Sequence, residues 1–208
     1  MANITAQMIK ELRERTGVGP LDCKKALEQF DGDMDAAAKF LREKGLAKAD
    51  KKASRVAKEG IIQTYQHFNG RIAVIVEVNC ETDFVAKTEA FQEFARDLAL
   101  HIANMAPKYV SREEVPESVL AAERDIQRKR ALDEGKPEHI ADKIVEGRMD
   151  KFFEEIVLLE QPFLKDDSKT IEELRKEVVA ATGENIVIRR FARFELGEGD
   201  DEAAESEE

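Results

Sequence analysis

Apolar residues recur three or four positions apart in three short runs within the first 45 residues, which places each run on one face of a helix. Thr5 can cap the first helix and Gly17 can end it. Pro20 suits the first position of the second helix, and Asp33 can cap a third helix that ends at Gly45. The apolar positions are Met8, Ile9 and Leu12, then Cys23, Ala26, Leu27 and Phe30, then Met34, Ala37, Ala38 and Leu41. We predict a three-helix bundle, too small for a robust core of its own and expected to lean on a partner surface.

Farther along the chain the apolar positions alternate, which is the period of a strand. Residues 61–68 and 71–78 flank Asn69-Gly70. An Asn-Gly pair between alternating runs is a strong hairpin signal, with both turn residues at positive φ. Two strands alone are marginal, so we expect residues 185–196 to add a third strand and close an antiparallel sheet. The residues of this strand that can face a core are Ile186, Ile188 and Phe191.

Helical periodicity returns between the hairpin and the last strand, in four runs separated by breaks that contain proline or glycine. These runs lie near Thr88–Met105, Pro116–Asp133, Pro137–Leu158 and Thr170–Ala181. Helices that cover a three-stranded antiparallel sheet make an α+β domain over residues 60–196. The expected organisation is a helical bundle at 1–45, a basic helical linker at 46–59, this α+β domain and a tail at 197–208.

Charge is distributed unevenly along the 208 residues. The formal net charge is −11, and residues 197–208 alone carry seven acidic residues and no basic one. Such a segment cannot bury enough apolar surface to fold, so we expect it to be disordered. The linker, in contrast, is basic and can face a phosphate backbone, an acidic protein or solvent. We favour a solvated linker without direct nucleic-acid binding, because no aromatic residue or glycine is interleaved for base stacking among Lys48, Lys51, Lys52, Arg55 and Lys58.

The composition also excludes several classes of protein. Cys23 and Cys80 lie far apart without a Cys-x-x-Cys pair, and the chain has only three histidines, so neither a disulfide framework nor a zinc module is indicated. The spacing reveals no metal or cofactor site. No window reaches the roughly 20 apolar residues of a membrane span, and Met1–Lys10 lacks the apolar core of a signal peptide. We expect a cytoplasmic protein that binds no membrane.

The segment Cys80–Val85, directly after the hairpin, allows two interpretations. In the first, Thr82 or Asp83 caps a helix and Phe84 packs in the core. In the second, the end of a strand and the start of a helix present an acid and an aromatic ring together, which is the arrangement of a binding anchor. The spacing alone does not choose between them.

Several blocks of residues resemble the bacterial elongation factor Ts family, the nucleotide exchange factors of elongation factor Tu. The matching blocks are Glu11-Leu12-Arg13, Thr16 to Gly19, Asp22 to Leu27, Arg71 to Val74, Val78 to Ala86, Glu146 to Met149 and Gln161 to Phe163. They follow the order of the family and are spread through most of the chain. This agreement favours the second interpretation of the segment after the hairpin.

The resemblance implies a fold and a mode of binding. The bundle would resemble a ubiquitin-associated domain and dock on the nucleotide-binding domain of the partner. Asp83 and Phe84 would reach toward the magnesium and phosphate site of that partner. The residues thereby marked for partner contact are Arg13, Val18, Gly19 and Leu21 in the bundle, and Thr82, Asp83, Phe84 and Val85 after the hairpin. Exchange needs no catalytic residue, because binding energy alone can weaken nucleotide binding.

The chain departs from the family pattern in two respects. Many members carry Met-Met where this chain has Pro20-Leu21, so the resemblance does not extend to the docking contact of the first methionine, while Leu21 can keep an apolar contact. Longer members have a doubled core, whereas this chain has one hairpin unit and resembles the short form, in which two copies supply that core. In the longer members a histidine of the second hairpin unit also touches the partner, and His67 matches it. We therefore expect a homodimer whose subunits share one binding site.

Two alternative functions come from other classes. A hydrolase would pair Cys80 with His67 or His101, but it would need a third, orienting group that the spacing does not show. An adaptor of the ubiquitin-associated type would use only the bundle, without exchange activity, and would have no reason to carry the block from Thr82 to Val85.

Overall fold

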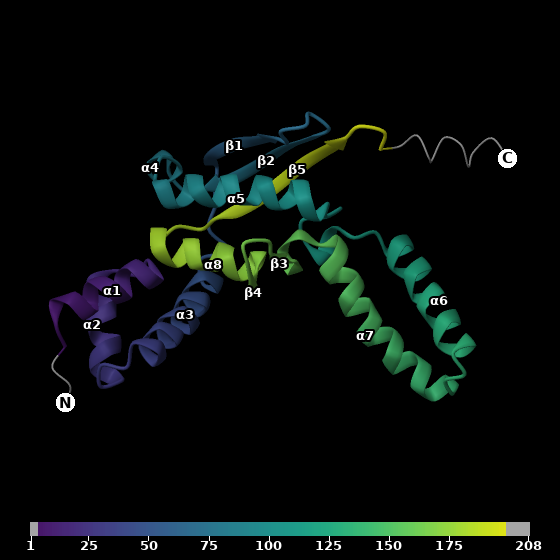
Figure 1. The fold of residues 1–208 in the computed structure, drawn as a ribbon, viewed down its shortest axis with the longest axis horizontal. Helices are drawn as coiled ribbons and strands as arrows, with labels where there is room; N and C mark the ends of the chain where they lie inside the picture. The colour runs from purple at the N-terminus through teal and green to yellow at the C-terminus, as the bar shows by residue number, and fades with distance from the viewer. Residues whose placement is uncertain (1–3, 199–208) are drawn as a thin grey trace. The chain divides into compact units, whose positions relative to one another are not determined.

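The computed structural model describes residues 4–198, apart from the side chains of residues 46–48. The acidic tail was predicted to be disordered, and this prediction concerns residues that, from position 199 onward, lie outside the described part of the chain. The chain divides into two units. The first consists of Met1–Thr64, Ile75–Leu98 and Glu172–Arg190, and the second of Tyr65–Val74, Ala99–Ile171 and Phe191–Glu208. Figure 1 traces the elements of both units in chain order.

Three helices open the first unit, as predicted. They are α1 (Ala6–Thr16), α2 (Pro20–Gln29) and α3 (Met34–Asp50). The Thr5 side chain accepts a hydrogen bond from the amide of Met8, and Gly17 ends α1 with a φ of +66°. The Asp33 side chain caps α3 by accepting from two amides. The bundle core is built from the buried side chains of Leu12, Cys23, Ala26, Leu27, Ala37 and Leu41. These local caps confirm the predicted bundle.

Helix α3 does not end at Gly45, and that detail of the sequence prediction is wrong. The helix continues to Asp50 with Gly45 buried in its interior. A Cβ atom at this position would lie 3.1 Å from the Cβ of Ala180 on α8 (Ile171–Thr182). Arg42 forms ion pairs with two acids of α8, Glu173 and Glu177. The glycine therefore permits close packing of two helices, whereas an isolated glycine in a sequence reads as a helix end.

The predicted three-stranded sheet is present, with β1 (Glu59–Gln66), β2 (Ile72–Cys80) and β5 (Val187–Glu195) in the order β1-β2-β5. Hydrogen bonds between Arg71 and Leu196 fit an antiparallel arrangement of β2 and β5. The mixture of helices with this sheet confirms the α+β class.

The turn between β1 and β2 differs from the prediction. Gly70 has a φ of +70°, but Asn69 does not adopt positive φ. The amide of Gly70 donates to the carbonyl oxygen of His67, and the amide of His67 donates to the carbonyl oxygen of Ile72. The connection is thus longer than a two-residue turn, and only the glycine takes the left-handed conformation. Asn69 instead accepts a side-chain hydrogen bond from the amide of Arg71.

Strand β2 has one buried face and one exposed face. Val74, Val76 and Val78 are buried, whereas Ile75 between them is 47% exposed. On β1, Ile62 is 66% exposed. Helix α5 (Glu89–Met105) follows β2 later in the chain, and its side chains at Phe91, Phe94 and Leu98 are buried. The outward side chains of the strands leave apolar surface uncovered.

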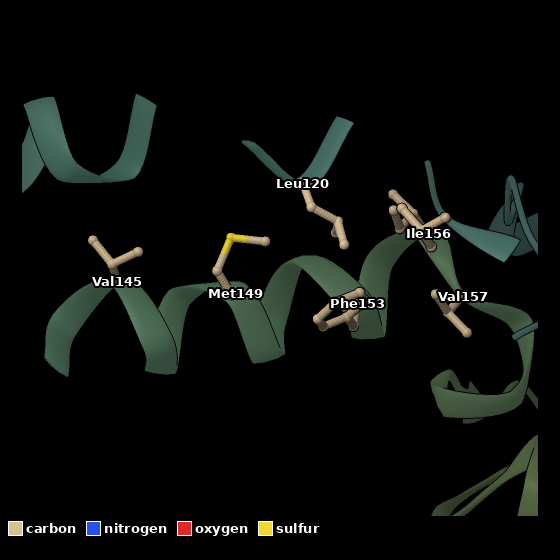
Figure 2. Packing of buried hydrophobic residues seen from close by; sticks show 7 residues of the cluster. Leu120, Val145, Met149, Phe153, Ile156 and Val157 are labelled. Carbon is tan, nitrogen blue, oxygen red and sulfur yellow. The ribbon is translucent and has the colours of Figure 1, made fainter. Parts of the chain in front are cut away.

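A pair of helices dominates the second unit. Helices α6 (Glu117–Asp133) and α7 (Glu138–Ile156) enclose an apolar cluster, and Figure 2 shows Leu120 of α6 pointing toward Met149 and Phe153 of α7. The four predicted helical runs correspond closely to α5, α6, α7 and α8. Within residues 4–198, no helix is both long enough and apolar enough to cross a membrane.

Several short elements were not predicted. They are the strand pair β3 (Pro162–Phe163) and β4 (Asp166–Thr170), and the 3-10 helices η1 (Arg112–Glu114) and η2 (Leu158–Glu160). The one-turn helix α4 (Asp83–Ala86), in contrast, begins directly after Thr82, which is one of the two caps predicted for this segment. Strand β4 has the sequence DDSKT, which contains no apolar residue. A strand of this kind cannot be recognised from alternation of apolar and polar residues.

A buried histidine connects α5 to the β3–β4 hairpin in the second unit. The Nδ1 atom of His101 accepts a hydrogen bond from the amide of Leu164, and its Nε2 atom lies 3.0 Å from Oε1 of Gln161. Gln161 in turn donates through Nε2 to the carbonyl oxygen of Glu155. Because Nδ1 is an acceptor, Nε2 carries the proton of a neutral ring. Burial lowers the pKa of His101, against the opposing effect of its bond to Gln161.

We predict that acid destabilises this part of the fold. Since the folded pKa of His101 is depressed, the unfolded chain binds a proton at a higher pH than the folded chain does. The contribution to stability is complete above the ordinary value of about 6.5 and is lost as the pH falls from there toward the folded pKa. Denaturant unfolding between about pH 7.5 and 5.5 should show this loss, reduced in His101→Leu but unchanged in the exposed control His139→Leu. Equal slopes in both variants would contradict the assignment.

Candidate partner-binding site

The segment marked by the sequence lies where β2 ends and α4 begins. Cys80 is the last residue of β2, and Thr82 is the N-cap of α4. Thr82 has an extended backbone, with φ −130° and ψ 155°, and its hydroxyl oxygen accepts from the amide of Val85 at 3.4 Å. A threonine in this conformation satisfies one of the amides that a helix start leaves unpaired.

The first turn of α4 separates an exposed ring from buried aliphatic groups. Phe84 is 79% exposed, whereas Val85 and Ala86 are buried. Val85 and Ala86 therefore attach the turn to the first unit, and Phe84 projects from it. The interpretation that Thr82 caps a helix is confirmed, but the interpretation that Phe84 packs in the core is wrong.

Asp83 is the first residue of α4 and is also exposed. Its Oδ2 atom accepts a hydrogen bond from Nζ of Lys87 at 2.6 Å. This bond lowers the pKa of Asp83, so the carboxylate is charged at neutral pH. An exposed pair of this kind contributes little to stability. The carboxylate can therefore exchange Lys87 for a donor on another molecule at small cost.

The bundle residues marked by the sequence lie around the connection between α1 and α2. Leu21 is 68% exposed near the start of α2, and Gly19 is the N-cap, which has no side chain to cap the helix. Val18 packs partly against the bundle core, while Arg13 in the last turn of α1 is exposed. Of these residues, Leu21 presents the most exposed large apolar side chain, and Arg13 and Gly19 are exposed as well.

His67 follows β1 and belongs to the second unit, whereas the bundle residues and residues 82–85 belong to the first. Its Nδ1 atom lies 3.0 Å from the hydroxyl oxygen of Tyr65, and the centre of its ring lies 4.4 Å from that of Phe68. Phe68 is 93% exposed. His67 is thus held by an aromatic neighbour on each side at the tip of the hairpin.

Cys80 has none of the properties of a nucleophile. The residue is buried, and its Sγ atom donates to the carbonyl oxygen of Thr82 at 3.1 Å. Burial, reinforced by the negative charge of Glu184, raises the pKa of the Cys80 thiol to about 11. The thiol is therefore protonated at neutral pH, and a reactive cysteine requires the thiolate. The hydrolase alternative loses its nucleophile.

One residue that the sequence did not mark takes part in this site. The carboxylate of Glu184, between α8 and β5, accepts hydrogen bonds from the amides of Glu81 and Thr82 and from the hydroxyl of Thr82. Glu184 lies 102 positions from Thr82 along the chain. No local sequence pattern predicts this contact. The two segments lie close in the fold because β2 and β5 are neighbours in the sheet.

Comparison with known proteins gives a consistent result. The family model described as "Elongation factor TS" matches residues 23–198. A protein named elongation factor Ts from Carboxydothermus hydrogenoformans is 59% identical over 196 residues, which cover 94% of this chain and 90% of the relative. The protein of that name from Desulforamulus reducens is 55% identical over 210 residues, covering 99% and 97% of the two chains. The one from Thermoanaerobacter sp. is 58% identical and covers 94% and 96%.

Proposed function

This chain belongs to the elongation factor Ts family, and from that premise we propose that it binds elongation factor Tu carrying GDP and promotes release of the GDP. The emptied partner is then free to take up GTP. The reaction takes place in the cytoplasm with translation, and it breaks no covalent bond.

The proposed mechanism follows from thermodynamic linkage. A protein that binds nucleotide-free elongation factor Tu more tightly than the GDP-bound form must weaken GDP binding by the same factor. The nucleotide is held through its phosphates and magnesium, so a change at those groups raises its dissociation rate. This chain needs only binding groups that favour the altered partner, and no catalytic residue, metal or cofactor of its own.

The exposure of Phe84 is the observation that best supports this proposal. A phenyl ring that is 79% exposed on a capped turn, beside the charged Asp83, has the character of an interface anchor. In our proposal Phe84 enters an apolar pocket of the partner as a wedge. Asp83 then acts close to the magnesium and phosphate site, and Thr82 and Val85 hold the turn in place.

Docking is assigned to the bundle at residues 1–45, with Leu21 as its apolar contact. Arg13, Val18 and Gly19, at the end of α1 and in its connection to α2, are the other residues that we assign to this docking patch. In this proposal the bundle provides most of the affinity for elongation factor Tu, and the segment at residues 82–85 disturbs the nucleotide site.

A charge at the docking patch should weaken binding without altering the bound state. Leu21→Glu places an acid in the first turn of α2, where it favours the helix dipole, so the bundle should stay folded. Losing the burial of one leucine should raise the concentration needed for half-maximal GDP release by about tenfold or more. The maximal rate at saturation should stay within about twofold of the unmodified chain. An unchanged half-saturation concentration in stopped-flow titrations would rule out docking through Leu21.

We further propose that the working species is a homodimer formed through the sheet of the domain at residues 60–196. Exposed apolar side chains on the strands, including Ile62 and Ile75, support this arrangement. Two-fold packing of such faces would give a closed sandwich. One subunit would present Asp83 and Phe84 to the partner, and the other would present His67.

The decisive experiment measures GDP release directly. Elongation factor Tu loaded with a fluorescent GDP analogue is mixed in a stopped-flow instrument with excess unlabelled GDP, with and without this protein. The proposal requires a release rate that rises with the concentration of the protein and then saturates. Binding to elongation factor Tu without any acceleration would favour the adaptor alternative.

A further inference from the structure

The carboxylate of Glu184 braces the two residues that join β2 to α4. Its Oε2 atom accepts from the amides of Glu81 and Thr82, both at 3.0 Å. Its Oε1 atom accepts from the hydroxyl of Thr82 at 2.6 Å. All three donors belong to the junction that sets the direction of α4.

A second carboxylate, that of Glu81, binds the segment that carries Glu184. Oε1 of Glu81 accepts from the amide of Asn185 at 2.7 Å and lies 3.5 Å from the guanidinium of Arg55. The buried Asn185 side chain donates to the carbonyl oxygens of Ala53 and Arg55. Each of two adjacent chain segments therefore holds the backbone of the other through a glutamate. The loop that carries Glu184 is therefore held by the contacts of Glu184 and by those of the next residue, Asn185.

Helix α4 needs such a brace. It has four residues, a single turn, and a helix this short is not stable by its own hydrogen bonds. Val85 and Ala86 attach one side of the turn. The direction in which Phe84 projects then depends on Thr82, whose hydroxyl both caps α4 and contacts Glu184.

We propose that Glu184 is a positioning residue for nucleotide exchange, which holds Thr82 so that α4 presents Asp83 and Phe84 in one orientation. This inference rests on the proposed function. Glu184 itself need not touch the partner or the nucleotide. Its effect on exchange passes through Phe84, and it depends on the shape and reach of the acceptor group more than on its charge.

Two substitutions separate reach from charge. Glu184→Gln keeps the length and one acceptor oxygen, which can take both amides while its NH2 group donates to the hydroxyl oxygen of Thr82. Glu184→Asp keeps the charge but withdraws the oxygens by one methylene. We expect Glu184→Asp to lower the maximal rate of GDP release by about fivefold or more, with half-saturation within about twofold. Glu184→Gln should stay within about twofold of the unmodified rate.

A double-mutant cycle tests whether Glu184 acts through the ring. In a Phe84→Ala background, Glu184→Asp should change the maximal rate by less than about twofold, because the group it positions is gone. Glu154→Asp, at an exposed position of α7, is the matched control and should have no effect in either background. Equal effects of Glu184→Asp with and without Phe84 would overturn the proposal. So would a loss in Glu184→Gln that exceeds the loss in Glu184→Asp.

Amide hydrogen exchange of the free protein keeps this test separate from the proposed function. In Glu184→Asp the amides of Glu81 and Thr82 should exchange faster, with the bundle unchanged. If the unmodified protein does not accelerate GDP release at all, the proposed function fails, whatever these amides show. If it does accelerate release and Glu184→Asp matches it while the two amides are loosened, only the positioning role fails.

Discussion

Phe84→Ala should slow stimulated GDP release by about 10- to 150-fold, the range that corresponds to losing roughly 1.5 to 3 kcal/mol of ring burial in the transition to the open partner. The same substitution should change the melting temperature of the free chain by no more than about 2 °C. The reason is that the ring is 79% exposed and contributes little to the core. Stopped-flow release and thermal unfolding of the same preparation measure the two quantities.

The control for this prediction removes an exposed apolar side chain elsewhere. Leu132→Ala, at the end of α6 and 39% exposed, should leave the release rate unchanged, because it lies outside the segment at residues 82–85. Phe84→Leu should recover part of the rate, because it restores part of the buried area. A large drop in melting temperature that parallels the loss of rate would show that Phe84 stabilises the fold instead.

Ile75→Asp should convert the protein into a monomer with poor exchange activity. Ile75 is 47% exposed on β2, and a carboxylate there would have to be buried without a partner if two copies pack through the sheet. Sedimentation at micromolar concentration should change from twice the chain mass of 23.5 kDa to the chain mass itself. Exchange should fall because each bound partner would lack the His67 of a second subunit.

A matched substitution on α6 distinguishes the interface from a general effect of charge. Ile126 is 45% exposed, and Ile126→Asp should leave both mass and exchange unchanged. A fully active monomer at all concentrations would refute the shared site, while leaving the role of Phe84 intact.

Local signals were sufficient to predict the helical bundle and most of the longer elements. The Thr5 and Asp33 caps, the stop at Gly17 and the start at Pro20 depend on side chains within a few residues of the helix ends, and all are present as predicted. Local signals predicted the cap at Thr82, but the binding role of residues 82–85 came from the resemblance to the family, because the spacing alone did not choose between the two interpretations.

Features that depend on distant contacts could not be predicted. Gly45 lies inside α3, where Ala180 packs closely against it. The residues near Gly45 in the sequence do not predict that contact. The conformation of Asn69 follows from the length of the connection between β1 and β2, which the Asn-Gly pair does not specify. Glu184 contacts Thr82 across 102 positions. Whether Phe84 pointed inward or outward was likewise a question of tertiary packing.

The strands of the three-stranded sheet are synthesised at very different times, because β5 lies far from β1 and β2 in the sequence. Arg71, just before β2, bonds to Leu196, 125 positions later, so the hairpin leaves the ribosome long before the strand that completes its sheet. The bundle and the α6–α7 pair are built from contacts close in sequence and can fold as they emerge, whereas the sheet must wait for non-local pairing. Glu184 is also made late, so a nascent or truncated chain can possess a folded bundle without a braced α4. If the proposed function holds, such a chain should dock on elongation factor Tu but release little nucleotide, so we expect exchange only from the completed fold.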